Sequence, residues 1–308
     1  MTLRFACVDI GTNAVQTLVA EIRGRDDFQV LDVQAVITRL GEGVDASGLL
    51  AQSAMSRTLA ELDAARGRLA AEGVSEVVIV GTSALRDAEN RAEFEQRVGA
   101  ETGWSLRILS EREEASYSFR AASAGLGLGE RPALVIDVGG GSTEFIWGVA
   151  GEPADWVSLP LGSVRLTERL IRSNPVSDGD YQRVVERIDA ELSTLQAPIA
   201  ADVVVGMAGT FTTLVAVERG LEPYAAEQVH GARLAWTEVS RQVQEYRRFS
   251  VAARSKIRGL DPRRADVILV GALIVERAMT RFGFDEALIS DYGLNYGILA
   301  ERAALVDV

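Results

Sequence analysis

Residues 8–20 read VDIGTNAVQTLVA, and residues 136–148 read IDVGGGSTEFIWG. Both stretches run from an apolar residue through Asp and a second apolar residue to Gly, and then through small residues into another apolar stretch. This pattern predicts a β-strand with an aspartate near its end, a tight glycine turn and a returning strand. The two aspartates, Asp9 and Asp137, are separated by about the length of a domain. The simplest interpretation is that the chain contains two copies of one domain.

Further strand-to-turn patterns surround this repeat, and segments of helical character separate them. We expect helices over 47–72, 176–195 and 262–281, the last opening at Pro262. Alternating strands and helices predict an α/β fold. The additional strand-to-turn stretches are VVIVGTSALR (77–86), VVVGMAGTFTTL (203–214) and LISDYGLNYG (288–297).

The stretch AGLGLGERP (124–132) is rich in glycine and ends in proline, so it breaks the preceding helix. The chain has 308 residues, and single hydrophobic cores stop growing at roughly 250–300 residues. We therefore expect two domains, 1–124 and 125–296, with the boundary in this stretch.

Charge and composition limit the partners. The formal net charge is −12, and a field of that sign repels nucleic acid and anionic membranes. No apolar run approaches the ~20 residues that span a bilayer, and a single cysteine fits a reducing compartment. We therefore expect a cytoplasmic protein that binds neither nucleic acid nor a membrane.

Three of the turns are suited to phosphate, because small residues let a bound anion approach the backbone amides. Each follows a predicted strand, which makes the set more informative than one turn alone. The candidate phosphate-binding residues are Gly11, Thr12 and Asn13 in the first turn, Gly139, Gly140, Gly141 and Ser142 in the second, and Gly209 and Thr210 in the third.

Acidic residues flank the second turn. Asp137 and Glu144 stand on either side of the glycines, so a hairpin would bring both carboxylates to one place, with Asp9 contributed by the other domain. Mg²⁺ takes one or two carboxylates together with water and substrate oxygens. The alternative is that each aspartate is a turn residue that accepts hydrogen bonds from nearby amides.

A pair of glutamates begins the helix in ILSEREEASYSFRAA (108–122). Ser110 and Glu113 have the spacing of a capping box, which gives Glu113 a structural role. Glu114 has no such role, and the helix dipole is expected to lower the pKa of its carboxyl group. It is either a surface glutamate or a catalytic base. Arg86 follows a turn and would reach a phosphate, or else it pairs with Asp87 or Glu89.

Several other chemistries lack the necessary residues. Cys7 lies within a strand, and Asn13 stands where a cysteine phosphatase would need arginine. The single histidine, His230, has no candidate catalytic or metal-binding partner near it in the sequence. This excludes serine–histidine and histidine–metal chemistry. No GxxxxGK[ST] motif occurs, which excludes P-loop NTPases.

Taken together, these motifs resemble the exopolyphosphatase/guanosine pentaphosphate phosphatase (Ppx/GppA) family, in its short two-domain form. The resemblance covers the whole chain, and DVGGGSTE together with an upstream EEA helix is its most specific part. The other matching segments are VDIGTNAVQTLVA, GTSALRDAENR, LPLGSVRLTE, GMAGTFTTL, RGLDPRRADVILVGA and SDYGLNYGIL.

The resemblance implies two ribonuclease-H-like domains of the actin, Hsp70 and sugar-kinase superfamily, with an active site in the interdomain cleft. It also implies a last helix, at about 297–308, that packs on the first domain. Glu114 matches the family's catalytic glutamate, Asp137 and Glu144 match its metal ligands, and Arg86 matches its phosphate-contacting arginine. The three turns match its phosphate loops. The implied cofactor is Mg²⁺, with Mn²⁺ as an alternative, and a homodimer is a further expectation.

The implied reaction is hydrolysis of the terminal phosphate of inorganic polyphosphate by metal-assisted attack of water. Two positions depart from the family pattern, because Ala14 stands where the family has a hydroxyl residue and Gln16 stands where it has Arg or His. The extra C-terminal domains of long members are also lacking. Short polyphosphate chains are therefore the expected substrates. Guanosine pentaphosphate remains an alternative. So do a small-molecule kinase of the same superfamily and a weakly catalytic member that senses a ligand.

Overall fold

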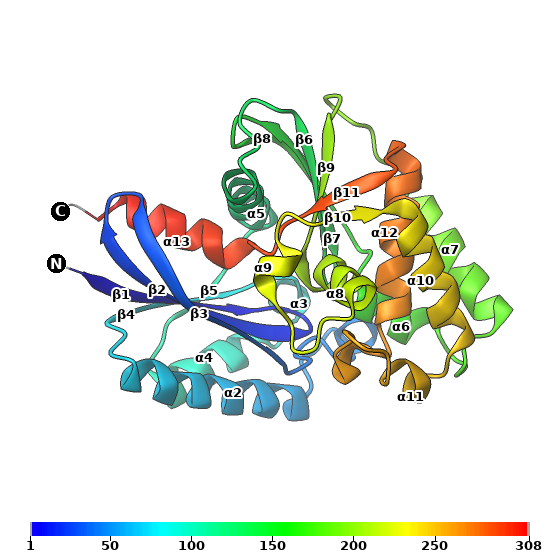
Figure 1. Ribbon diagram of the computed structural model, residues 1–308. Coiled ribbons are helices and arrows are strands. Elements are labelled where there is room, and N and C mark those ends of the chain that lie inside the picture. The colour runs from blue at the N-terminus through cyan, green and yellow to red at the C-terminus, as the bar shows by residue number, and fades with distance from the viewer. Residues whose placement is uncertain (1, 307–308) are drawn as a thin grey trace. The chain divides into compact units, whose positions relative to one another are not determined.

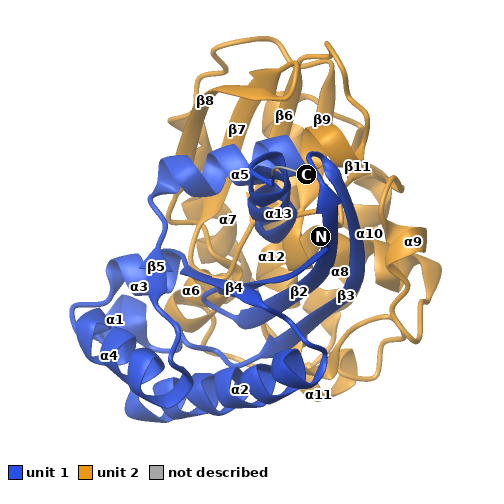
Figure 2. Cartoon of the chain, turned by 90° about the vertical axis from the view of Figure 1, so that its left-hand side faces the viewer, with its two compact units in different colours: residues 1–121, 294–308 blue, residues 122–293 orange. Residues whose placement is uncertain are grey.

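The structure is a computed structural model that describes residues 2–306. It divides into two compact units, which Figure 2 colours blue and orange. Unit 1 comprises residues 1–121 and 294–308, and unit 2 comprises residues 122–293. Unit 1 is therefore built from two separate pieces of the chain.

Unit 1 contains a five-stranded sheet in the order β3-β2-β1-β4-β5. The first three strands form an antiparallel meander, and β4 and β5 continue the sheet parallel to β1. The strands are β1 (Leu3–Ile10), β2 (Ala14–Gly24), β3 (Asp27–Ile37), β4 (Glu76–Gly81) and β5 (Leu106–Ile108). The helices are α1 (Val44–Ser47), α2 (Gln52–Ala71), α3 (Ser83–Asp87), α4 (Arg91–Thr102), α5 (Glu111–Gly125), which crosses the unit boundary, and α13 (Leu294–Ala304).

Unit 2 repeats this plan and adds a sixth strand, in the order β10-β11-β9-β6-β7-β8. Here β6, β7 and β8 form the meander, and β9 and β11 are parallel to β6. The strands are β6 (Ala133–Val138), β7 (Thr143–Val149), β8 (Glu152–Leu159), β9 (Val203–Met207), β10 (Arg233–Ala235) and β11 (Glu286–Ile289). The helices are α6 (Ser163–Leu170), α7 (Asp178–Ser193), α8 (Ala208–Arg219), α9 (Ala226–Val229), α10 (Trp236–Arg248), α11 (Val251–Arg254), the 3₁₀ helix η1 (Pro262–Arg264) and α12 (Ile268–Phe282).

The two sheets confirm the predicted α/β fold of two ribonuclease-H-like domains. Strands β1 and β2 correspond to β6 and β7, which are the two stretches that the Asp–Gly pattern relates. Both pairs are antiparallel, with a short glycine turn between them.

The core of unit 1 has a layer on each face of its sheet. Successive side chains of a strand point to opposite faces, so Ala6, Val8 and Ile10 of β1 pack with α2 and α4, and Phe5 and Cys7 pack with α13. Figure 1 shows α2 and α4 on one face of this sheet and α13 on the other. In unit 2, the almost entirely apolar α12 is the central helix of the core.

Helix α13 attaches to unit 1 through polar contacts as well as apolar ones. The Tyr117 hydroxyl of α5 donates a hydrogen bond to the Glu301 carboxylate (2.7 Å). Arg302 forms a bidentate ion pair with Glu76, with N–O distances of 2.7 and 2.8 Å. The helix ends at Ala304. Residues 307–308 of the expected helix lie outside the described residues.

Two expected helices begin later in the structure than the sequence predicts. The helix expected over 262–281 begins as η1, where Asp261 accepts a hydrogen bond from the Arg263 amide (2.9 Å), and continues as α12 only from Ile268. The helix expected over 47–72 is α2, which begins only at Gln52, because Gly48 (φ 70°) ends the short helix α1 before it. Across residues 2–306 no helix has both the length and the apolar character needed to cross a membrane.

Candidate active site

The two hairpin turns have the same internal hydrogen bond. The Gly11 amide donates to the Ala14 carbonyl (3.0 Å), and the Gly139 amide donates to the Ser142 carbonyl (3.0 Å). Other carbonyl groups of the turns accept hydrogen bonds from later segments of the chain. In unit 1, for example, the Gly41 amide donates to the Thr12 carbonyl (2.9 Å). The remaining backbone amides of the two turns have no hydrogen-bond acceptor within residues 2–306. They belong to Thr12 and Asn13 in unit 1 and to Gly140, Gly141 and Ser142 in unit 2. These amides are available to an anion.

The third predicted turn is the start of α8. This helix begins directly after β9, so the amides of Gly209 and Thr210 lie in its first turn and lack helical acceptors. The helix dipole also favours an anion at this end. Thr210 Oγ1 donates to the Val138 carbonyl (3.3 Å), which fixes the start of α8 beside the end of β6. Unit 2 therefore brings the second and third phosphate turns together.

Asp137 and Glu144 are directly opposite each other across β6 and β7. Opposite residues of an antiparallel pair have Cβ atoms about 4.5–5.5 Å apart on the same face, so the expected carboxylate pair is present. Glu144 is buried, and its Oε1 accepts a hydrogen bond from the Ser158 hydroxyl (2.8 Å). The corresponding pair in unit 1 is Asp9 and Gln16, which supplies only one carboxylate.

The donor set of unit 2 fits a hard divalent cation. Two carboxylates next to phosphate-binding amides suit Mg²⁺, which completes its shell with water and substrate oxygens. Within residues 2–306 no group of three or more His, Cys, Asp and Glu side chains is arranged to hold a metal. Asp9, the third expected ligand, belongs to unit 1, and its participation stays a prediction.

The predicted capping box is confirmed at the start of α5. The Glu113 amide donates to Ser110 Oγ (3.3 Å), and Glu113 Oε2 accepts from the Ser110 amide (2.9 Å) and hydroxyl (2.7 Å). The bonds from Ser110 lower the pKa of Glu113 to about 2, with a further contribution from Arg107. Glu113 therefore has the structural role that its position indicates.

Glu114 differs from the sequence expectation. Its Oε2 accepts a hydrogen bond from Arg86 Nη1 (2.6 Å), and only 12% of its side chain and 17% of that of Arg86 are exposed. Burial raises the pKa of Glu114, Arg86 opposes that rise, and nearby Glu111 adds to it. The expectation of a lowered pKa was wrong because loss of hydration outweighs the helix dipole at this position.

The candidate residues of unit 1 lie at one edge of its sheet. The carboxyl ends of the parallel strands β1, β4 and β5 meet there, and ligands of α/β sheets bind at such edges. The Thr82 amide donates to the Ile10 carbonyl (3.3 Å), and the Leu109 amide donates to the Gly81 carbonyl (2.9 Å). Arg86 also donates to the Leu109 carbonyl (3.1 Å). The Gly11 turn, Arg86 and Glu114 all follow strands that end at this edge.

Arg264 is a further candidate phosphate-binding residue that the sequence patterns did not indicate. A Cβ atom at Gly209 would lie only 2.4 Å from Arg264 Nη1, so glycine is required for the guanidinium group to lie against the start of α8. Burial lowers the pKa of Arg264, and Asp261 opposes that change, but an arginine stays charged at neutral pH. The segment RGLDPRRAD was part of the resemblance, and only the folded chain shows that this arginine lies beside the start of α8.

His230 has partners after all. Its Nε2 donates to the Gly125 carbonyl (3.0 Å), its Nδ1 accepts from the Asp291 amide (3.3 Å), and its ring stacks on Tyr292 at 4.1 Å between centroids. These contacts give it a structural role in unit 2. Cys7 is buried within the core of unit 1, and burial raises the pKa of its thiol, so neither residue supplies a nucleophile.

Comparison with known proteins gives consistent matches over nearly the whole chain. Residues 18–305 match the profile of the Ppx/GppA phosphatase family. Exopolyphosphatase 2 of Mycobacterium tuberculosis is 33% identical over 316 residues, which cover 97% of this chain and 98% of the relative. The crystal structure of the Aquifex aeolicus member of the Ppx/GppA family is 32% identical with a TM-score of 0.82, and it covers 98% of both chains. The structure of an exopolyphosphatase from Cytophaga hutchinsonii is 26% identical with a TM-score of 0.90, again over 98% of both chains. The chain therefore belongs to the Ppx/GppA phosphatase family and is a hydrolase that acts on phosphoanhydride bonds.

Proposed function

We propose that this protein is an exopolyphosphatase that removes the terminal phosphate from short inorganic polyphosphate. The observation that carries the proposal is in unit 2, where the paired carboxylates of Asp137 and Glu144 flank a turn whose amides at Gly140 and Gly141 have no acceptor among the described residues. A divalent cation and a phosphate group are the ligands that such an arrangement suits. The Mycobacterium tuberculosis relative of nearly equal length is named as an exopolyphosphatase.

The proposed metal is Mg²⁺, with Mn²⁺ as an alternative, and Asp137 and Glu144 are its proposed protein ligands together with Asp9. When bound, the ion neutralises part of the negative charge on the terminal phosphate. The hydrogen bond from Ser158 fixes the orientation of the Glu144 carboxylate.

The phosphate oxygens are the proposed ligands of the turn amides and of the two arginines, Arg86 and Arg264. Water attacks the terminal phosphorus atom in line with the bridging oxygen, the P–O anhydride bond breaks, and the shortened chain leaves. Glu114 is the proposed base that orients this water and accepts its proton. Burial strengthens Glu114 as a base, and the hydrogen bond from Arg86 holds its carboxylate in one orientation.

Guanosine pentaphosphate presents the same terminal phosphate on a nucleoside and therefore defines the main alternative. A kinase of the same fold would require an acceptor, and a sensing member would bind without turnover. The test measures phosphate released from tripolyphosphate, long-chain polyphosphate, guanosine pentaphosphate and ATP, each with Mg²⁺, with Mn²⁺ and with EDTA. The proposal predicts the highest kcat/KM on tripolyphosphate, with no release in EDTA.

Asp137→Asn provides the matched test of the metal site. The variant should lose activity with its free energy of unfolding nearly unchanged, because Asn keeps the volume but loses the charge that binds the ion. Asp178→Asn is the control, since that aspartate is in the same unit and its side chain is 97% exposed. Full activity in excess EDTA would refute the metal assignment, and a preference for guanosine pentaphosphate would replace polyphosphate as the substrate.

A further inference from the structure

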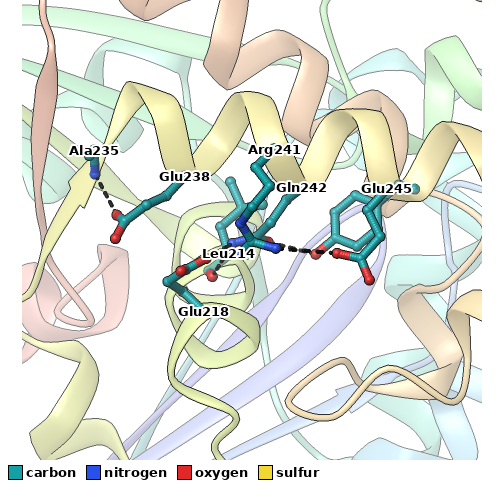
Figure 3. Close-up of polar contacts among 8 residues, drawn as sticks. Leu214, Glu218, Ala235, Glu238, Arg241, Gln242 and Glu245 are labelled. Carbon is teal, nitrogen blue, oxygen red and sulfur yellow. Dashed lines mark hydrogen bonds and ion pairs between the residues drawn. The ribbon is translucent and has the colours of Figure 1, made fainter.

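A buried polar network links α10 to α8 (Figure 3). Gln242 Nε2 donates to the Leu214 carbonyl of α8 (3.0 Å) and to Glu218 Oε2 (3.1 Å). The Tyr246 hydroxyl donates to Gln242 Oε1 (2.7 Å). Gln242 and Tyr246 are fully buried, and their hydrogen bonds join α10 to α8.

Arg254 extends this network to the segment after α11. Its Nε donates to the Tyr246 carbonyl (2.6 Å), and its Nη1 donates to the Ala265 carbonyl (3.2 Å). The side chain is 1% exposed, and its Nη2 has no acceptor within residues 2–306. A buried arginine with an unsatisfied N–H group destabilises a fold, and an apolar side chain of similar volume is often more stable in such a position. Packing alone therefore does not account for an arginine at position 254.

Residues 259–265, which Arg254 binds through the Ala265 carbonyl, run alongside α8 from its C-terminal end to its N-terminal end. Near the end of α8, Gly259 has a φ of 86°, and a Cβ atom there would lie 2.3 Å from the Ala216 carbonyl oxygen. Near the beginning of α8, the guanidinium group of Arg264 fills the space beside Gly209. Both close approaches require glycine. The Arg254 hydrogen bond falls on Ala265, the residue directly after Arg264.

The contacts thus form a closed circuit within unit 2, from α8 through Gln242, Tyr246 and Arg254 to Ala265, and through Arg264 back to the start of α8. We propose that Arg254 is a positioning residue for phosphate binding, which holds the Arg264 guanidinium at the N-terminus of α8. This inference rests on the proposed function, because it assigns Arg264 to the phosphate of the substrate. Arg254 itself is buried and does not touch the substrate.

The test is a double-mutant cycle on the whole protein with tripolyphosphate as substrate. Arg254→Met keeps the volume and removes the hydrogen bonds, and Arg264→Met removes the phosphate contact. Arg254→Met should raise KM by about 10-fold, the size of a typical coupling within one network, with a much smaller change in kcat. It should raise KM no further in the Arg264→Met background. Arg277→Met is the matched control, because that arginine of unit 2 pairs with Asp189 at 2.7 Å, and its loss should leave KM unchanged.

The outcomes separate the inference from the proposed function. If the wild-type protein releases no phosphate from tripolyphosphate, the proposed function fails and the inference fails with it. If the wild-type protein is active but Arg254→Met keeps the wild-type KM, or raises it equally in both backgrounds, only the inference is overturned. Should Arg254→Met not fold, Arg254→Lys takes its place. Lysine keeps the charge but reaches one carbonyl rather than two, and a partial rise in KM supports the proposal whereas a wild-type KM overturns it.

Discussion

Replacing each glutamate of the α5 pair by glutamine separates the proposed chemistry from local structure. Glu114→Gln removes the charge of the proposed base, and Glu113→Gln weakens the capping box. A general base contributes roughly 10²–10⁴-fold to the rate, so Glu114→Gln should lower kcat by that factor. The hydrogen bonds of Glu113 go to Ser110 and Arg107, so Glu113→Gln should keep kcat within about two-fold, since a cap acts on stability rather than on chemistry.

The stability changes follow from the same contacts. Glutamine at position 114 still accepts a hydrogen bond from Arg86 but loses the charge attraction across 2.6 Å. That attraction is offset by the cost of burying the carboxylate, which is why the pKa of Glu114 is raised. The raised pKa means that the ionised carboxylate is disfavoured in the folded protein, so we expect Glu114→Gln to change the free energy of unfolding by no more than about 1 kcal/mol, the scale of a neutral hydrogen bond. Loss of the capping box should cost about 1 kcal/mol. The two variants should thus have similar stabilities and very different rates.

Steady-state phosphate release from tripolyphosphate and urea unfolding of each variant measure the two quantities. The expected result is a large fall in kcat for Glu114→Gln alone, with comparable unfolding midpoints. If Glu114→Gln keeps the wild-type kcat, the glutamate is not the base. If Glu113→Gln loses as much rate as Glu114→Gln, the effect belongs to the helix terminus, and the assignment of roles within the pair is refuted.

Three other predictions concern charge and packing. Arg86 lowers the pKa of Glu114, so Arg86→Met should shift the acidic limb of the pH–kcat profile to higher pH. An unshifted limb would mean that Glu114 is not the titrating group. The pKa of Glu113 is about 2 in the folded protein and 4.5 otherwise, so ionised Glu113 stabilises the fold above about pH 4.5, and this stabilisation is lost as the pH falls toward 2. Urea unfolding from pH 6 to pH 3 should show this loss in the wild type and a smaller loss in Glu113→Gln, whereas identical pH dependence would contradict it. Gly209→Ala should raise KM for tripolyphosphate, because the new Cβ displaces the Arg264 guanidinium, and a wild-type KM would show that this arginine does not bind the substrate.

The sequence predicted those features whose signal lies within a few consecutive residues. The Asp–Gly hairpins of Asp9 and Asp137 and the capping box of Ser110 and Glu113 are of this kind, because strand alternation, turn glycines and helix caps act locally. The cross-strand pairing of Asp137 with Glu144 follows from the short turn between them. Each of these interactions joins residues that are close together in the sequence.

Features that depend on burial or on distant segments were not predictable in this way. Arg86 and Glu114 are 28 positions apart and meet only because two strand ends share one sheet edge. The direction of the Glu114 pKa shift depends on burial by neighbouring elements, which no local pattern expresses. The contacts of His230 with Gly125 and of Arg264 with Gly209 likewise require the folded chain.

The discontinuity of unit 1 has a consequence for its synthesis. A ribosome makes β1 and β2 early, but α13, which covers Phe5, Cys7 and Leu18 on one face of their sheet, is made only after the whole of unit 2. Domains fold as units while the chain emerges, so unit 2 has all of its residues before unit 1 does. Until residues 294–304 appear, an apolar face of the first sheet stays uncovered, and a nascent chain stalled before that point presents a surface for chaperones or for aggregation.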